Sequence, residues 1–133
     1  MAYDLQVIPR DGYLHFRVTG ENTPENLAGY LTESLQHAVE AGCPYALVEE
    51  HLTGPELSLE TVREIIDELQ FAARQHLKAF AFVNTNPEHS GDLTRFAENL
   101  AAMRNINMRV FRSVPEAEAW IRFVSGGDRE ASG

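Results

Sequence analysis

Cysteine is almost missing from this sequence, which has only Cys43 among its 133 residues. A single cysteine cannot form an internal disulfide, and it leaves no cysteine-rich framework for a structural metal. Cys43 follows a predicted helix end, and no base is expected to turn toward it, so we interpret it as a buried structural thiol. The sequence therefore predicts a fold that depends on its apolar core.

Basic residues are also few. Lysine and arginine number 11 against 20 aspartates and glutamates, which gives a net charge of −9. The basic residues are scattered singly, so no local cluster offsets the negative charge. A surface of this sign repels phosphate backbones and anionic lipid headgroups. The composition therefore disfavours nucleic acids and anionic membranes as partners.

Long apolar runs and familiar active-site motifs are absent from the sequence. No run approaches the ~20 residues that span a bilayer, and the first residues lack the pattern of a secretory signal. We therefore expect a cytoplasmic protein without membrane insertion. The sequence also lacks the glycine-rich phosphate and dinucleotide motifs and the Gly-x-Ser-x-Gly motif of hydrolases. It predicts no enzyme, no catalytic or metal-ligating residue and no cofactor.

The apolar pattern that is present predicts strands alternating with helices. Two alternating segments, residues 3–7 and 13–19, flank Asp11-Gly12, a dipeptide typical of hairpins. Further strands are predicted over residues 45–48, 79–83 and 108–112, and helices over 24–41, 59–77, 92–104 and 114–124. The order β-β-α-β-α-β-α-β-α indicates an α/β fold with four helices. Its central sheet is expected to be mainly parallel, with an antiparallel N-terminal edge strand.

This pattern fills one domain over residues 1–124. Residues 125–133 are polar and rich in glycine, so they are predicted to form a flexible tail. Among single side chains, His15, His37 and His76 are expected at the surface or at its boundary. Phe71 is expected in the core, with an exposed protein-binding patch as the alternative.

Several segments carry a resemblance to a known family. They are residues 13–21 entering the first helix, 46–49 in the next strand, 108–113 in the last strand, and Ala117 with 119–121 in the last helix. With the order of elements, these segments resemble STAS domains, and most closely their SpoIIAA-like bacterial subfamily, over roughly residues 3–124. The resemblance implies a bacterial, regulatory protein-binding module.

In the antagonist proteins of that family, a partner kinase phosphorylates a residue within an Asp-Ser-(Ser/Thr)-Gly turn. This sequence reads Gly54-Pro55-Glu56-Leu57-Ser58 there, so the motif is absent and only Ser58 lies near the family's site. Serine is also a leading residue at helix N-caps. We interpret Ser58 as an N-cap, with a phosphosite as the alternative, because the neighbouring glutamates oppose a phosphate dianion.

Polar residues are expected to meet at the carboxyl edge of the sheet, where open α/β sheets bind ligands. Successive strand residues face opposite sides, however, and Glu49-Glu50-His51 has no recognised metal-ligand spacing. We interpret these three as solvated loop residues, with a polar pocket or weak metal site as the alternative. The candidate partner or ligand site comprises Glu49, Glu50, His51, Leu52, Leu57, Ser58, Asn84 and His89.

Three functions remain open from the sequence. The first is a non-enzymatic module that docks a protein partner, or a second copy of itself to give a dimer, through the region around residues 50–60 and the second helix. The second is a small-molecule or lipid-binding domain, because STAS-like domains resemble the lipid-exchange (CRAL-TRIO) fold and an apolar ligand could lie between sheet and helices. The third is an enzyme that uses His51 or His89 with nearby carboxylates, which no residue spacing supports.

Overall fold

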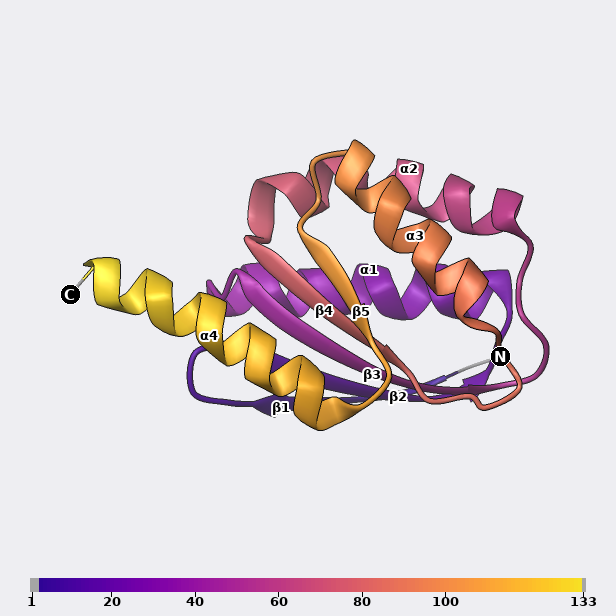
Figure 1. Ribbon diagram of the computed structural model, residues 1–133, viewed down its shortest axis with the longest axis horizontal. Helices are drawn as coiled ribbons and strands as arrows, with labels where there is room; N and C mark the ends of the chain where they lie inside the picture. The colour runs from indigo at the N-terminus through magenta and orange to yellow at the C-terminus, as the bar shows by residue number, and fades with distance from the viewer. Residues whose placement is uncertain (1–2, 133) are drawn as a thin grey trace.

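Strands and helices alternate along the chain in the predicted order (Figure 1). The structure, a computed structural model, describes the backbone of residues 3–132 and the side chains of residues 3–126. The elements are β1 (Asp4–Pro9), β2 (Leu14–Glu21), α1 (Pro24–Ala41), β3 (Tyr45–Thr53), α2 (Leu59–His76), β4 (Ala79–Asn84), α3 (Gly91–Met103), β5 (Met108–Phe111) and α4 (Val114–Ser132).

The five strands form one sheet in the order β1-β2-β3-β4-β5. β1 pairs antiparallel with β2, and every other neighbouring pair is parallel. The mainly parallel sheet with an antiparallel N-terminal edge strand is therefore confirmed. Parallel neighbours bring the carboxyl ends of β2, β3 and β4 to the same edge of the sheet, and this edge positions the site.

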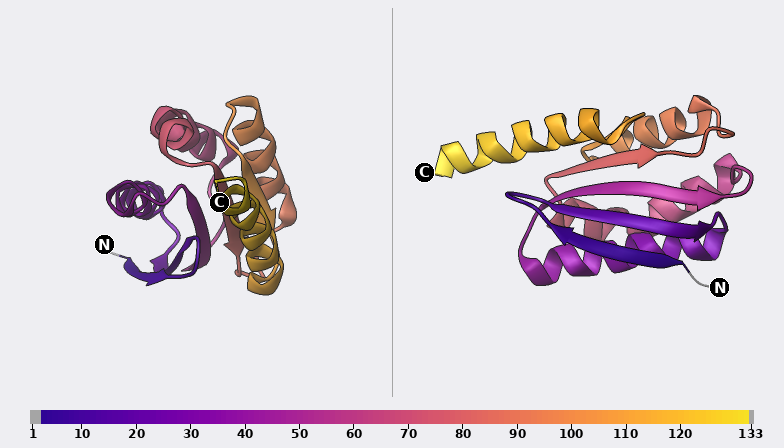
Figure 2. Two further views of the ribbon diagram at one scale, coloured as in Figure 1. Left: turned by 90° about the vertical axis from the view of Figure 1, so that its left-hand side faces the viewer. Right: turned by 90° about the horizontal axis from the view of Figure 1, so that it is seen from below.

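Helices cover both faces of the sheet (Figure 2). α4 packs on one face against β3, β4 and β5. On the other face α1 packs against β2 and α3 against β5, whereas α2 packs mainly against α1 and α3. The second helix therefore bridges its two neighbours instead of resting directly on the sheet.

Alternation along the strands divides the apolar residues into two cores. Leu47 of β3 packs toward α4, with Ala81, Val83 and Ile121. Val48, the next residue, packs on the α1 face. A strand buried on both faces has a nearly continuous apolar run instead of an alternating pattern, which explains why the sequence of β3 indicates a central strand.

Local signals fix the ends of α1. The side chain of Thr23 accepts a hydrogen bond from the backbone N–H of Asn26, and Pro24 occupies the first helical position. Gly42 ends the helix with φ of 62°, a left-handed conformation that glycine adopts without strain. The predicted start and end of this helix are confirmed.

Two elements extend well past their predicted ends. β3 continues to Thr53, so Glu49, Glu50 and His51 belong to the strand itself. α4 continues to Ser132, past the predicted domain end at residue 124, and Ser125 is buried within it. Gly133, the last residue of the predicted tail, lies outside the described residues.

Two predicted side-chain positions are wrong. Phe71 was expected in the core, but 66% of it is exposed on the outer side of α2. His15 was expected at the surface or at its boundary, but only 3% of it is exposed. His76 is exposed as predicted, and Cys43 is half-buried between the two cores.

Candidate functional site

Glu49 and Glu50 are consecutive residues of β3, and their side chains therefore leave the sheet on opposite faces. Glu49 lies on the α4 face and Glu50 on the face of α1, α2 and α3. Both are buried, with 5% and 4% exposed. The prediction that they are solvated loop residues is wrong, because β3 continues between two paired strands instead of ending at Val48.

Glu49 is held by three donors. Its Oε1 lies 2.9 Å from Nε2 of His15, and its Oε2 lies 2.5 Å from Nε2 of His51. Arg17 donates to the same Oε2 from Nε and Nη2, at 3.3 and 3.2 Å. A carboxylate has two acceptor oxygens, and here both are occupied by side chains of neighbouring strands.

These donors set the ionisation of Glu49. Burial alone would raise its pKa, but the hydrogen bonds from His51 and His15 and the charge of Arg17 outweigh burial and lower the pKa below its usual range. Glu49 is therefore an anion at neutral pH. His15 is buried because it bonds this anion, and its other ring nitrogen lies 3.4 Å from Arg10.

A hydroxyl extends the Glu49 group toward the next strand. Nδ1 of His51 lies 2.9 Å from Oγ1 of Thr85, directly after β4. The same hydroxyl donates to the backbone carbonyl of Glu50 at 2.8 Å. Carboxylate, imidazole and hydroxyl therefore form a chain of hydrogen bonds across the carboxyl edge of the sheet.

Glu50 has fewer hydrogen-bond donors around its carboxyl group than Glu49 has. Tyr30 of α1, which is fully buried, donates from its hydroxyl to Oε2 of Glu50. Burial raises the pKa of Glu50 to about 7, although the Tyr30 hydrogen bond and the nearby His89 and His51 oppose this rise. Near neutral pH this carboxyl group therefore exists in both protonated and ionised forms.

His89 joins two loops beside Glu50. Its Nδ1 lies 3.0 Å from Nδ2 of Asn84, and its Nε2 lies 2.8 Å from the carbonyl of Gly54. Because a carbonyl oxygen can only accept, Nε2 carries the proton that binds Gly54, and Nδ1 accepts from the Asn84 amide. His89 thus ties the loop after β4 to the loop after β3 and has no ring nitrogen left to ligate a metal.

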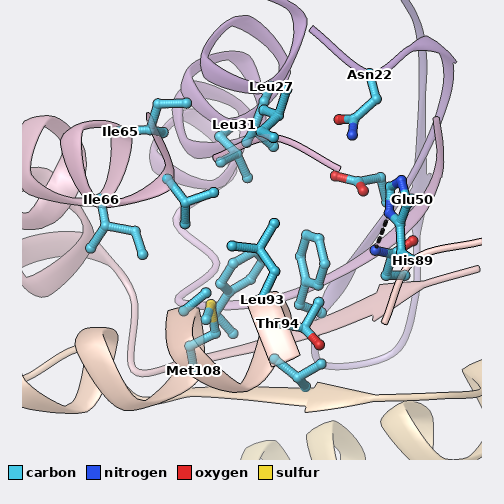
Figure 3. A pocket seen from close by; sticks show the side chains of 17 residues that line it. Asn22, Leu27, Leu31, Glu50, Ile65, Ile66, His89, Leu93, Thr94 and Met108 are labelled. Atoms are coloured by element: carbon cyan, nitrogen blue, oxygen red, sulfur yellow. Dashed lines mark hydrogen bonds between the residues drawn. The ribbon is translucent and has the colours of Figure 1, made fainter. Parts of the chain in front are cut away.

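An apolar cavity lies between α2, its two neighbouring helices and the sheet (Figure 3). Its volume is about 100 Å³. A single water needs roughly 10–15 Å³ measured in this way, so the space, which is partly open to solvent, has room for more than a single water. Most of its lining is aliphatic or aromatic, with polar groups of Asn22, Glu50, Asn84, His89 and Thr94.

A second cavity of about 100 Å³ adjoins the first toward the amino ends of the strands. The two share five lining residues, which are Leu31, Ile65, Ile66, Phe80 and Met108. Ser34 of α1 lines the second cavity and is 5% exposed. Its hydroxyl has no hydrogen-bond partner among the residues that the structure describes.

The structure divides the eight predicted site residues into four groups. Glu50, Leu57, Asn84 and His89 line the apolar cavity. Glu49 and His51 form the cluster on the opposite face, and Leu52 is a core residue with 2% exposed. Ser58 is exposed and caps α2, accepting from the backbone N–H of Thr61 at 3.1 Å, so the N-cap interpretation is confirmed.

Sequence reasoning missed four residues of these groups: His15, Arg17, Tyr30 and Thr85. Arg17 stands directly beside Glu49 in the register of β2 and β3, so a longer predicted β3 would have paired them. Tyr30 lies at helical spacing with the apolar residues of α1, a pattern that indicates packing and does not point to Glu50. Thr85 follows a predicted strand end, but no pattern in the sequence aligns it with His51.

Two further classes of site find no support in the described part of the chain. Within residues 3–126, no group of three His, Cys, Asp or Glu side chains is arranged to hold a metal ion. Over residues 3–132, no helix is long and apolar enough to cross a membrane.

No protein-family model matches the chain, and no curated protein matches it. A solved structure is similar in fold: an uncharacterized protein of the DUF3478 family, with a SpoIIAA-like fold, from Shewanella loihica PV-4. The TM-score is 0.56 at 20% sequence identity, and the match covers 90% of this chain and 94% of the other. Together with the observed strand order, this match shows that the chain has the SpoIIAA-like α/β fold.

Proposed function

We propose that this chain is a non-enzymatic binding module that takes a small apolar ligand between α2 and the sheet. The observation that carries the proposal is the apolar cavity, together with the second cavity that adjoins it. Binding pockets for small molecules are concave, mostly apolar and few in a protein. Two adjoining apolar spaces beneath the same helix fit this description.

The position of α2 supports the same function. It packs mainly on α1 and α3, and the cavity separates it from β4. A helix that covers a cavity can move outward without breaking strand pairing, which gives a ligand an entry path. Pockets for small molecules are typically apolar with a few polar groups at one end, and this lining has that composition.

The non-enzymatic part of the proposal rests on what surrounds Thr85. A hydroxyl nucleophile needs free N–H donors for the oxyanion that forms on its substrate. Beside Thr85 the backbone N–H groups are engaged, since those of Asn86 and Glu88 bond amide side-chain oxygens and that of His89 bonds a carbonyl. The chain of hydrogen bonds from Glu49 through His51 to Thr85 therefore supports a structural role.

The test uses benzene, which binds dry apolar cavities, and thermal unfolding as the measurement. We expect benzene to raise the Tm, because a ligand that binds only the folded state stabilises it. Ala97 lines the cavity, so Ala97→Leu should fill it and abolish the shift while raising the Tm of the free protein. An equal benzene shift in Ala97→Leu, or no shift in the wild type, would contradict the proposal.

A second candidate function is docking of a protein partner or a second copy. Phe71, with 66% exposed, and Leu59, with 53% exposed, lie on α2 and favour it. Light scattering after size exclusion, with Phe71→Ser as the matched variant, tests self-association. A monomer at all concentrations, with no partner recovered from the native cell, would argue against this function.

We further propose a regulatory role in a bacterial cytoplasm, which the resemblance of the sequence to SpoIIAA-like proteins supports. Ser58 remains a candidate phosphosite, and its exposure makes it accessible to a kinase. Its hydroxyl already donates to Thr61 at 2.9 Å, and Glu56 and Glu60 flank it. An intact mass without a phosphate increment, in protein from its native cell under several growth conditions, would dispose of this role.

A further inference from the structure

Four of the five polar residues of the apolar cavity gather at one end, and the fifth, Thr94, donates its hydroxyl to the carbonyl of Gly91. Asn22, Glu50 and His89 lie on one side of the space, and Leu31, Ile65, Ile66 and Met108 lie across and beyond it (Figure 3). A ligand in this cavity therefore meets hydrogen-bonding groups at one end and hydrocarbon along the rest. A ligand that fits this lining has a polar head and an apolar body.

The protein already uses hydrogen-bond donors at the polar end for its own structure. Nε2 of His89 donates to the carbonyl of Gly54 at 2.8 Å, and Nδ2 of Asn84 donates to His89 at 3.0 Å. Nδ2 of Asn22 donates to the carbonyl of Pro55 at 2.9 Å. The loops are therefore tied together by the donors that a ligand head could otherwise have used.

Acceptors, by contrast, are in excess there. A carboxyl group offers about four lone-pair sites when ionised, and Glu50 receives one hydrogen bond among the described residues, from Tyr30. The amide oxygen of Asn22 receives none among the same residues. A head group that only accepts hydrogen bonds would face oxygen atoms, whereas a head that donates them would meet unused acceptors.

Charge favours the same kind of head. Burial disfavours the ionised form of Glu50, and the charged or titratable groups that face it are Tyr30, His89 and His51. No lysine or arginine lines the cavity. A cationic head would supply the opposite charge that this buried carboxylate lacks, because a charged donor forms a stronger hydrogen bond than a neutral one.

The other end of the space limits the apolar body. The second cavity continues past Ile65 and Ile66 to the buried hydroxyl of Ser34, which has no partner among the described residues. At about 100 Å³ each, the two cavities admit a short alkyl chain but not a two-chain lipid. The ligand is accordingly small.

We propose that the ligand is a short-chain alkyl amine, whose ammonium group binds the carboxylate of Glu50 and whose chain lies between α2 and β4. This inference rests on the proposed function, since it names the class of ligand that the same cavity takes. The binding is noncovalent, and Asn22 provides a second acceptor for the ammonium group.

Calorimetric titrations with octylamine, 1-octanol and octanoate at pH 7.5 test the head group with the chain held constant. We expect octylamine to bind about tenfold more tightly than 1-octanol, the size of a charge-assisted hydrogen bond over a neutral one, and octanoate not to bind. Glu50→Gln should bind both octylamine and 1-octanol with equal affinity. Glu40→Gln, which removes an exposed carboxylate on α1, should keep the tenfold preference.

The outcomes separate the ligand class from the proposed function. A tenfold preference retained in Glu50→Gln would overturn the inference, because attraction to the acidic surface would then explain it. Octanoate binding as tightly as octylamine would also overturn it. If benzene stabilises the protein and no octyl compound binds, the head-group inference fails while the function stands. If benzene has no effect either, the ligand class and the proposed function both fail.

Discussion

Two neighbouring glutamates of β3 have opposite environments. Glu49 accepts hydrogen bonds from His15, Arg17 and His51, and its pKa is lowered. Glu50 accepts one from Tyr30 beside an apolar cavity, and its pKa is raised to about 7. Both side chains have little exposed surface, but Glu50 lies deeper in the protein interior, so the pKa difference comes from this stronger burial as well as from the smaller number of donors around Glu50.

The difference separates a structural carboxylate from a ligand-binding one. A buried charge is tolerated when hydrogen bonds and opposite charges replace water, and costs free energy when they do not. Glu49 has these replacements within the protein. Glu50 lacks most of them, so a ligand can provide what the protein does not. Variants at the two positions should therefore change the free energy of unfolding by amounts that differ in sign as well as in size.

The largest effect is expected for Glu49→Gln. Both oxygens of Glu49 face donors, so whichever way the new amide turns, its NH2 group meets a donor, and Arg17 loses the opposite charge. Removing one partner of a buried ionic group costs roughly 3–5 kcal/mol. Urea unfolding at pH 7 measures this loss, with the exposed Glu40→Gln as control. A loss below about 1 kcal/mol would show that the cluster contributes little.

The next effect, for Glu50→Gln, depends on pH. The folded pKa of Glu50 is about 7 against an ordinary value of 4.5. Between these values the folded state binds more protons than the unfolded state, so the free energy of unfolding falls as pH rises from about 5 to above 7. A shift of this size corresponds to about 3 kcal/mol.

Glutamine resembles the protonated carboxyl and can still accept from Tyr30. Glu50→Gln should therefore match the wild type at pH 5 and exceed its stability by up to about 3 kcal/mol at pH 8.5. Glu49 contributes with the opposite sign: its lowered pKa means that stability is lost as pH falls through that pKa. If wild type and Glu50→Gln differ in free energy of unfolding by the same amount at pH 5 and at pH 8.5, this account of Glu50 is rejected.

Much of this comparison could be anticipated from the sequence, and part could not. The alternation rule placed Glu49 and Glu50 on opposite faces, and the order of elements placed them at the carboxyl edge. The sequence failed at the length of β3. Glutamate is depleted in strands, and the apolar run stops at Val48, so the sequence predicts that the strand ends there.

Pairing of β3 with both β2 and β4 overrides that local preference, because Glu49 and Glu50 stand in register with residues on both neighbouring strands. The cavity could not be predicted from the sequence, for a different reason. Apolar spacing places Ile65 and Ile66 on the inner side of α2, but it does not give the distance from helix to sheet. That distance follows from how α1 and α3 hold the helix, which no local pattern records.

The smallest effect is expected for Arg17→Gln, which removes one donor from Glu49 and leaves the two histidines. Half of the Arg17 side chain is exposed, and ion pairs in contact with solvent contribute about 0.2–1 kcal/mol. Urea unfolding should show a loss of about 0.5 kcal/mol that shrinks in 1 M salt, because salt screens an exposed charge more than a buried one.

Glu49→Gln should keep most of its loss in the same salt, since its contacts with His15 and His51 remain shielded. An Arg17→Gln loss as large as that of Glu49→Gln, and insensitive to salt, would mean that the arginine neutralises Glu49. The contrast with Glu50 would then rest on one missing cation instead of on the count of donors.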